Sequence, residues 1–256
     1  MSGYRLGTTS YILPEAVLPN VRYLAPRVDD VELVLFEVED GGSNLLSLEE
    51  VSELAALAVQ HDLSYTVHLP LDLRLGIEGD KRHRSLETAK VVIDRTRALD
   101  PWAYVLHLDG KNVQDPATWV DQAARALELS AEWAGGAERV AVENLEGYPL
   151  DFIDPVLDRV PVSRCLDIGH LWLDGQDPVP YLERHLGRAR VVHLHGIGSR
   201  DHQALTHIDP AELRRVLAVL DTGGFTGVLT LEVFGREDLE SSMGMLRELG
   251  VAAWTG

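Results

Sequence analysis

The sequence contains a single cysteine, Cys165, among 256 residues, so no disulfide can form within the chain. A chain without disulfides is typical of a reducing compartment, and we expect a cytoplasmic protein. No apolar run approaches the roughly 18–20 residues that a membrane-spanning helix needs, so we expect no membrane partner. The first residues, MSGYRLGTTS, lack the basic and then apolar segments of a secretory signal.

Basic residues are few. Lysine and arginine together number 23, against 41 aspartates and glutamates, which gives a formal net charge of −18. Such a chain repels polyphosphates at long range, whereas proteins that bind duplex nucleic acid neutralise several phosphates with clustered basic residues. We therefore expect no nucleic-acid partner. A small molecule that carries a single phosphate group is compatible with this charge.

Short apolar runs alternate with helical stretches along the chain. The runs predict eight strands, which end near Ser10, Glu37, His68, His107, Glu143, Asp167, between His193 and His195, and near Glu232. Strands that alternate with helices form a parallel sheet covered by helices. Eight such units without a linker favour an α/β fold with one (β/α)8 TIM barrel as a single domain over residues 1–256. A doubly wound open sheet and a two-domain chain are the alternatives.

The helical stretches have apolar residues at helical spacing. They predict helices over residues 48–59, 86–99, 119–133, 213–220 and 239–249. Ser47, followed three residues later by Glu50, predicts a capping box at the start of one helix. Asp115 before Pro116 predicts the start of another.

Six predicted strands end in a side chain that can bind a metal or transfer a proton: His68, His107, Glu143, Asp167, His193 and Glu232. A lone residue of this kind more often belongs to the core or caps a helix. In a barrel, however, these ends converge on the carboxyl-terminal face, where the active sites of this fold lie. Clustered carboxylates and imidazoles must pair or hold a cation when they are buried. Glu37 closes a seventh predicted strand.

The types of ligand narrow the choice of metal. Carboxylates and imidazoles without a cysteine suit Zn²⁺, with Mn²⁺ as the alternative, whereas Ca²⁺ prefers oxygen and structural zinc prefers sulfur. His170 follows Asp167 by one helical turn, and the segment RDHQALTHIDP adds Asp201, His202 and His207. These are too many ligands for one ion. We therefore expect two or three divalent ions that share a bridging carboxylate, as in enzymes that hydrolyse phosphoesters.

The motifs YTVHLP, VLHLDG, VAVENLEG, CLDIGH, VVHLHG and LTLEV follow one another along the chain. In this order they resemble the strand motifs of the xylose isomerase-like, endonuclease IV-like superfamily of TIM barrels. The resemblance implies metal ligands at His68, His107, Glu143, Asp167, His170, His193 and Glu232. In the trinuclear endonucleases a later Asp-x-His completes a third site. This chain has the adjacent pair Asp201-His202 instead.

The opening segment RLGTTSYILPEAVLPNVRYLAPRVDDVELVLFE carries a narrower resemblance. Together with the strand motifs it looks like the cobamide-remodelling phosphodiesterases of this superfamily. The resemblance implies hydrolysis of the nucleotide loop of cobalamin-type corrinoids, which releases cobinamide and α-ribazole phosphate. The substrate would then be a small-molecule phosphodiester. The few basic residues that we expect in loops on the catalytic face could contact its phosphate: Arg74, Lys81, Arg82, Arg84, Lys111, Arg200 and Arg236. We assign Arg74, Lys111 and Arg236 to substrate binding.

Metal-dependent phosphodiester hydrolysis is the leading hypothesis. Glu143 would bridge two ions, and Glu143, Glu232 and Glu37 are the candidate catalytic residues. His170, Asp201 and His202 would hold a third ion or position the leaving group. In the alternative, a sugar isomerase or epimerase, one ion is held by Glu143, Asp167, His193 and Glu232, and the two glutamates move protons beside a carbonyl. A third hypothesis is a barrel without activity. The oligomeric state is left open.

Overall fold

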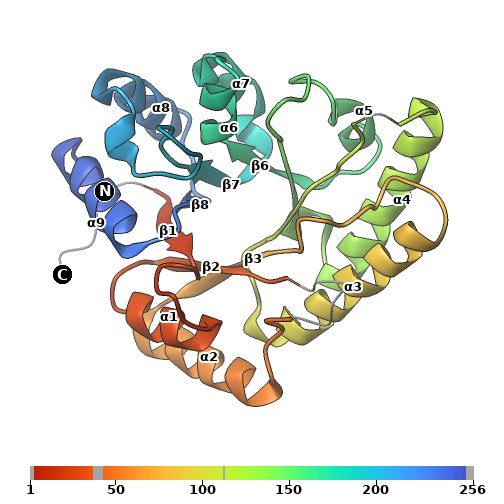
Figure 1. Cartoon of the computed structure of the whole chain (residues 1–256), viewed down its shortest axis with the longest axis horizontal. Coiled ribbons are helices and arrows are strands. Elements are labelled where there is room, and N and C mark those ends of the chain that lie inside the picture. The colour runs from red at the N-terminus through yellow and green to blue at the C-terminus, as the bar shows by residue number, and fades with distance from the viewer. Residues whose placement is uncertain (1–2, 37–42, 112, 252–256) are drawn as a thin grey trace.

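Eight short strands pair in parallel, each with the next along the chain, and the eighth pairs with the first (Figure 1). The structure is a computed structural model that describes residues 3–36, 43–111 and 113–251. Its strands are β1 (Arg5–Thr9), β2 (Asp30–Val34), β3 (Ser64–His68), β4 (Tyr104–Leu106), β5 (Val140–Glu143), β6 (Ser163–Asp167), β7 (Ala189–Leu194) and β8 (Val228–Leu231). The closed order confirms the predicted TIM barrel and excludes an open sheet, which would leave two unpaired edges.

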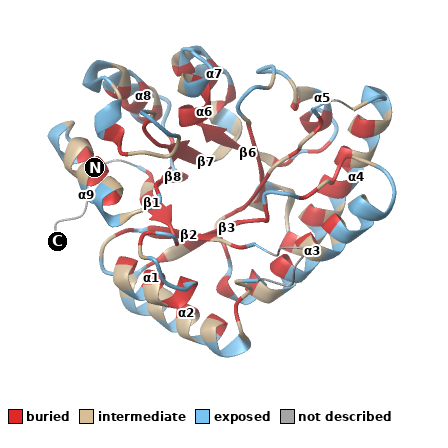
Figure 2. Ribbon diagram, viewed as in Figure 1, coloured by how far each residue is buried: buried red, intermediate tan, exposed pale blue. Residues whose placement is uncertain are grey.

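Helices surround the barrel and bury one face against it (Figure 2). They are α1 (Val17–Leu24), α2 (Leu48–His61), α3 (Asp80–Thr96), α4 (Pro116–Ala134), α5 (Asp154–Leu157), α6 (Ile168–Leu173), α7 (Pro178–His185), α8 (Pro210–Thr222) and α9 (Arg236–Glu248). Within the described ranges, none of these helices has the length and hydropathy to cross a membrane. The outer core between helices and strands is formed by aliphatic side chains, as the apolar runs predict.

The two predicted helix starts are confirmed. The Ser47 Oγ accepts from the backbone N–H of Glu50 at 3.2 Å, and the Glu50 carboxylate accepts from the Ser47 N–H at 2.7 Å, which completes the capping box. Asp115 Oδ1 accepts from the N–H groups of Ala117 and Thr118. Both caps satisfy backbone donors that the first helical turn leaves free.

The prediction for the third helix needs a correction. Helix α3 begins at Asp80 rather than at residue 86, because Gly79, with a φ of 83°, ends the preceding loop and turns the chain into the helix. The Arg82 guanidinium donates to the carbonyl of Leu75 and anchors the first turn. The charges of Lys81, Arg82 and Arg84 therefore lie on a helix and not in a loop.

Two further expectations about boundaries differ from the structure. Strand β2 ends at Val34, three residues before Glu37, which lies outside the described residues. Arg236 is the first residue of α9 rather than a loop residue. The apolar run VELVLFE extends beyond Val34, where β2 ends, because side chains at the rim of a barrel are still partly covered.

The barrel interior is partly polar. A small apolar cluster of Ala103, Val105, Ala141, Cys165 and Val191 fills one side of it. On β2 the side chains of Asp30 and Glu32, two residues apart, are completely buried. Because side chains alternate along a strand, these positions share one face, and Glu32 reaches β7 inside the barrel. Buried polar side chains therefore continue through the barrel interior to its carboxyl-terminal face.

Candidate metal centre

Strands β3 to β8 bring their ionisable residues together at one end of the barrel. His68, Glu143 and Asp167 are the last residues of β3, β5 and β6. His193 is the penultimate residue of β7, and His107 and Glu232 directly follow β4 and β8. All but His107 are buried. The fold thus assembles the six strand-end residues that sequence singled out.

Glu143 lies between several imidazoles. Its Oε2 atom is 3.2 Å from Nε2 of His68 and 3.2 Å from Nε2 of His107. The same oxygen lies 3.7 Å from Nδ1 of His193, and Oε1 lies 3.5 Å from Nδ1 of His170. One ligand atom each from His68, His107 and Glu143 lie within 4.8 Å of one another, so these three side chains could hold an ion.

A second group shares Glu143. It comprises Glu143, Asp167, His193 and Glu232, whose ligand atoms also lie within 4.8 Å of one another. Nδ1 of His193 is 3.1 Å from Glu232 Oε2 and 3.6 Å from Asp167 Oδ2. Glu143 therefore belongs to both groups, and each group could hold an ion.

A third group lies beside the second, toward the loop after β7. Its members are His170, His195, Asp201 and His202. Asp201 Oδ1 lies 3.2 Å from Nδ1 of His195, and His202 Nε2 lies 3.4 Å from Glu232 Oε2. The imidazoles of His195 and His202 stack with ring centroids 4.2 Å apart. The structure thus brings Asp201 and His202 to His170, while His207 is exposed and joins none of the groups found in the described residues.

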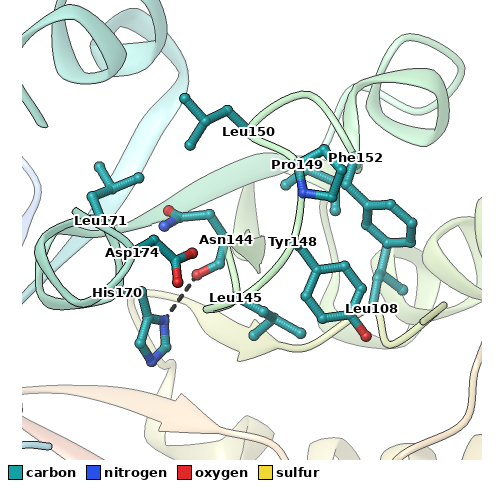
Figure 3. A pocket seen from close by; sticks show the side chains of 11 residues that line it. Leu108, Asn144, Leu145, Tyr148, Pro149, Leu150, Phe152, His170, Leu171 and Asp174 are labelled. Carbon is teal, nitrogen blue, oxygen red and sulfur yellow. Dashed lines mark hydrogen bonds between the residues drawn. The ribbon is translucent and has the colours of Figure 1, made fainter. Parts of the chain in front are cut away.

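Backbone carbonyls orient two of the imidazoles. The Nδ1–H of His68 donates to the carbonyl of Leu69 at 2.8 Å, and Nδ1 of His170 makes the same kind of bond to Asn144 at 3.0 Å (Figure 3). In the neutral ring, each bond favours the tautomer whose Nε2 carries a lone pair. Partners of this kind commonly fix metal-binding imidazoles in protein sites.

Asp167 has two roles at once. Its Oδ1 accepts from the backbone N–H of His170 at 2.7 Å and caps α6. Its Oδ2 is buried and has no hydrogen-bond partner among the described residues. Reciprocal hydrogen bonds between the Asn144 side chain and the Asp167 backbone tie the ends of β5 and β6 together. The cap and the ligand position are thus compatible in one side chain.

Several buried polar atoms in this cluster are unpartnered within the described part of the chain. They are Glu32 Oε1, Asp167 Oδ2, His193 Nδ1, His195 Nε2 and Glu232 Oε2. An unsatisfied buried polar group costs about 1–3 kcal/mol, and more when it is charged. Divalent cations would satisfy these atoms, and nitrogen and oxygen donors fit Zn²⁺ or Mn²⁺. The thiol of Cys165 lies within the cluster, but burial raises its pKa well above the usual value, so it stays protonated.

The charged groups of the cluster shift one another's pKa values. Burial lowers the pKa of His68, but the hydrogen bond and charge of Glu143 outweigh it and raise the pKa to about 9. In the same way, Asp167 and Glu143 overcome the effect of burial and raise the pKa of His170 to about 10. Burial alone would raise the pKa of Glu143, yet His107 and His193 hold it well below the usual value. Metal binding would therefore release protons from the imidazoles.

The sequence of this chain matches a family model, described as the xylose isomerase-like TIM barrel, over residues 28–249. The chain belongs to this family. No curated protein matches it. The motif resemblance to the superfamily is thereby confirmed.

Solved structures with the same fold include enzymes of different kinds. A D-tagatose 3-epimerase-like protein matches with a TM-score of 0.80 and 19% identity, covering 96% of each chain. Endonuclease IV from Thermus thermophilus matches with a TM-score of 0.71 and 22% identity, covering 95% of this chain and 99% of that one. The TTHB071 protein of the same organism, soaked with ZnCl₂, matches at 0.66 and 22%, covering 99% and 100%. Identities of this size show a shared fold.

Two members of the cluster were not among the predicted site residues of this xylose isomerase-like barrel. His195 lies 3.3 Å from Asp167 Oδ1. Glu32 lies on β2, and its Oε2 accepts from Nε2 of His193 at 2.9 Å. The sequence holds a signal for both, because His195 comes two residues after His193, just past the end of β7, and Glu32 is a charged residue inside an apolar run.

The predicted phosphate-binding residues occupy different environments. Arg74 pairs with Asp109 at 3.2 Å, so its charge is partly neutralised. Lys111 is exposed, with its Nζ 5.6 Å from the ring centroid of Tyr148. The Arg236 guanidinium is exposed and lies over the ring of Tyr23 at 4.9 Å. Assignment of these three to substrate binding stays a prediction.

An apolar cavity lies behind His170. Leu108, Tyr148, Phe152 and Leu171 line it together with the Asn144 side chain (Figure 3). The Tyr148 hydroxyl donates to Asp109, the carboxylate that also pairs with Arg74. With a volume of about 10 Å³, the cavity is about the size of one water molecule and holds no substrate.

Proposed function

We propose that this protein is a metal-dependent phosphodiesterase that hydrolyses the nucleotide loop of cobamides. The observation that carries the reaction class is the shared position of Glu143 in two potential ion-binding groups. Two ions bridged by one carboxylate suit phosphoester hydrolysis, since both the attacking and the leaving oxygen need stabilisation. A sugar isomerase or epimerase needs only one of these groups.

Each ion would have its own set of ligands, with Glu143 common to the first two. His68, His107 and Glu143 would hold the first, Glu143, Asp167, His193 and Glu232 the second, and His170, Asp201 and His202 a third, with His195 beside it. When bound, these ions would supply Lewis-acid stabilisation of the phosphate and lower the pKa of the attacking water. Zn²⁺ is the proposed metal, with Mn²⁺ as the alternative.

The surroundings of Glu232 and Glu143 favour their ionised forms. Burial would raise the pKa of Glu232, but the imidazoles of His193 and His202 hold it well below its usual value. Glu232 and Glu143 are therefore ionised at neutral pH and need lose no proton before they bind an ion or orient water. Glu37, which lies outside the described residues, stays a proposed catalytic residue that orients the substrate or accepts a proton.

Two observations support a small phosphodiester as substrate. The net charge of −18 opposes a nucleic-acid polymer but not a compact molecule with one phosphate. Exposed basic side chains, Lys111 and Arg236, are available for that phosphate. The corrinoid itself is proposed from the resemblance of the opening segment to cobamide-remodelling phosphodiesterases.

Incubation with cobalamin tests the proposal. The metal-loaded protein is incubated anaerobically with cobalamin, and the products are separated by chromatography. We expect cobinamide and α-ribazole phosphate, and no such products with the Asp167→Asn variant as the matched control. Failure of the metal-loaded wild type to release cobinamide would exclude the cobamide substrate.

A sugar isomerase or epimerase is the second candidate. The quartet Glu143, Asp167, His193 and Glu232 supports it, because one ion flanked by two glutamates could polarise a carbonyl and move protons beside it. The fold shared with the D-tagatose 3-epimerase-like protein is compatible with this reaction. Ketose epimerisation with one bound ion, and no release of phosphate esters, would favour this candidate.

A further inference from the structure

Three exposed aromatic side chains lie together at the mouth of the barrel. Tyr11, Phe36 and Phe234 follow β1, β2 and β8, and they are 36%, 37% and 41% exposed. The Tyr11 ring centroid is 6.4 Å from that of Phe36 and 6.4 Å from that of Phe234. We call these three side chains the aromatic rim. Every aromatic residue among the large exposed hydrophobics of the described chain belongs to it.

The backbone beneath the rim is held by hydrogen bonds that continue past the strand ends. Thr9 Oγ1 donates to the carbonyl of Val233 at 2.8 Å, next to Phe234. The N–H of Phe36 donates to Asn44 Oδ1 at 2.7 Å. Strands β8, β1 and β2 are neighbours in the barrel (Figure 1), and the ring of Tyr11 lies between those of Phe36 and Phe234. Hydrogen bonds thus hold the backbone near Phe36 and Phe234, while the rings themselves are exposed.

The aromatic rim adjoins the metal centre. The ring centroid of Phe234 is 5.2 Å from that of His202, a member of the third ligand group. Most candidate ligands lie at the ends of β3 to β8 or in the segments that follow β6 and β7, whereas the rim occupies the ends of β8, β1 and β2. A molecule whose phosphate reaches the ligands can therefore place an adjoining group against the rim.

We propose that the aromatic rim is a substrate subsite that binds a planar ring next to the phosphate. Exposed aromatic faces bind flat π-systems by stacking or by edge contacts, and they do so with little loss of rotamer freedom when their backbone is fixed. A ligand with one flat apolar part and one anionic part could contact the aromatic rim and the proposed metal centre at the same time. This inference rests on the proposed function for the phosphate, and it names the chemistry of the adjoining group.

The test compares phenylphosphonate with methylphosphonate, which share the anionic group and differ by the ring. Binding of each to the Zn²⁺-loaded protein is measured by titration calorimetry, so that no turnover is required. We expect phenylphosphonate to bind at least about fivefold more tightly, which is the lower end of the effect of one stacked ring. Phe234→Ala and Tyr11→Ala should reduce this ratio toward one and leave the affinity for methylphosphonate unchanged.

Two further variants sharpen the comparison. Leu173→Ala is the matched control, since Leu173 is 42% exposed at the end of α6 and lies outside the rim, and we expect the wild-type ratio. Phe234→Leu retains apolar surface without the ring and should also lower the ratio. Thermal unfolding confirms that each variant is folded, which the exposure of these side chains favours.

The outcomes separate this inference from the proposed function. Equal affinity for the two phosphonates, no measurable binding of either, or an unchanged ratio in Phe234→Ala would overturn the subsite. A change of oligomeric state in Phe234→Ala would assign the rim to a second copy of the chain and would also overturn it. A selective ratio that depends on the rim, together with no release of cobinamide from cobalamin, would leave the subsite standing and reject the cobamide substrate.

Discussion

Nε2 of His193 lies 2.9 Å from Oε2 of Glu32, and both side chains are completely buried inside the barrel. The imidazole N–H donates to the carboxylate, so the lone pair of the neutral ring is on Nδ1. That atom lies 3.1 Å from Oε2 of Glu232 and within the second ligand group. A carboxylate that holds the far nitrogen of a metal-binding histidine fixes its tautomer and raises its basicity.

Glu32→Gln should therefore weaken metal binding. The amide keeps the size of the side chain but removes the negative charge that favours donation from Nε2 of His193. Loss of such a partner typically costs about 10–100-fold in metal affinity, and we expect the lower end because an amide oxygen can still accept. Competition with a chromophoric chelator measures the affinity for Zn²⁺ directly.

Asp30→Asn is the matched control for that experiment. Asp30 lies on the same strand and is equally buried, but its carboxylate accepts from Ser64 Oγ at 2.6 Å rather than from a metal-binding residue. We expect its Zn²⁺ affinity to stay within about twofold of the wild type. If Glu32→Gln binds Zn²⁺ as tightly as this control does, Glu32 has no positioning role.

Glu143→Gln and Asp167→Asn should abolish activity while the barrel stays folded. Both replacements are close in size but neutral, and they remove anions that the proposed metal centre needs. Asn is also a good helix cap, so Asp167→Asn should preserve the start of α6. We expect turnover of cobalamin to fall more than about 100-fold, with circular dichroism unchanged. Near-normal turnover in either variant would contradict the assignment of that residue.

The purified protein should contain at least two divalent ions per chain. The three ligand groups offer more nitrogen and oxygen atoms than one four- to six-coordinate ion can use. Elemental analysis after removal of loosely bound metal measures the stoichiometry, and His68→Ala should lower it by one. A single ion in the wild type would favour the isomerase candidate instead.

Local patterns in the sequence predicted the strands and the strand-end residues well. The strand that ends at His68 and the cap at Ser47 follow from contacts within a few residues. The bond between Glu32 and His193 joins β2 to β7 across the barrel interior, so it depends on closure and register, which no local pattern specifies. The aromatic rim likewise depends on which side chains remain exposed after closure. His195 was missed although it comes only two residues after His193, just past the end of β7.

Lowering the pH below about 6.5 should destabilise the fold through His185. Burial, together with the charge of Arg164, lowers the pKa of His185 from 6.5 to about 4 in the folded protein. Between these values the unfolded chain binds more protons than the folded one, so stability falls as the pH decreases.

The variant His185→Gln measures this contribution. Its melting temperature should depend less steeply on pH between about 4 and 6.5 than that of the wild type, whatever its absolute stability. The comparison of slopes cancels the histidines of the metal centre, which both proteins share. Parallel pH profiles would show that His185 does not titrate in this range.

Binding to duplex DNA should be weak, although the chain shares its fold with an endonuclease IV. The net charge of −18 opposes the release of counterions that drives association with a polyphosphate. We expect a dissociation constant above about 1 μM at physiological salt for a fluorescent duplex, with or without an abasic site, in an anisotropy titration. Submicromolar, salt-sensitive binding of the abasic duplex alone would instead favour nucleic-acid repair at this metal centre, because only clustered basic contacts give both strength and salt dependence.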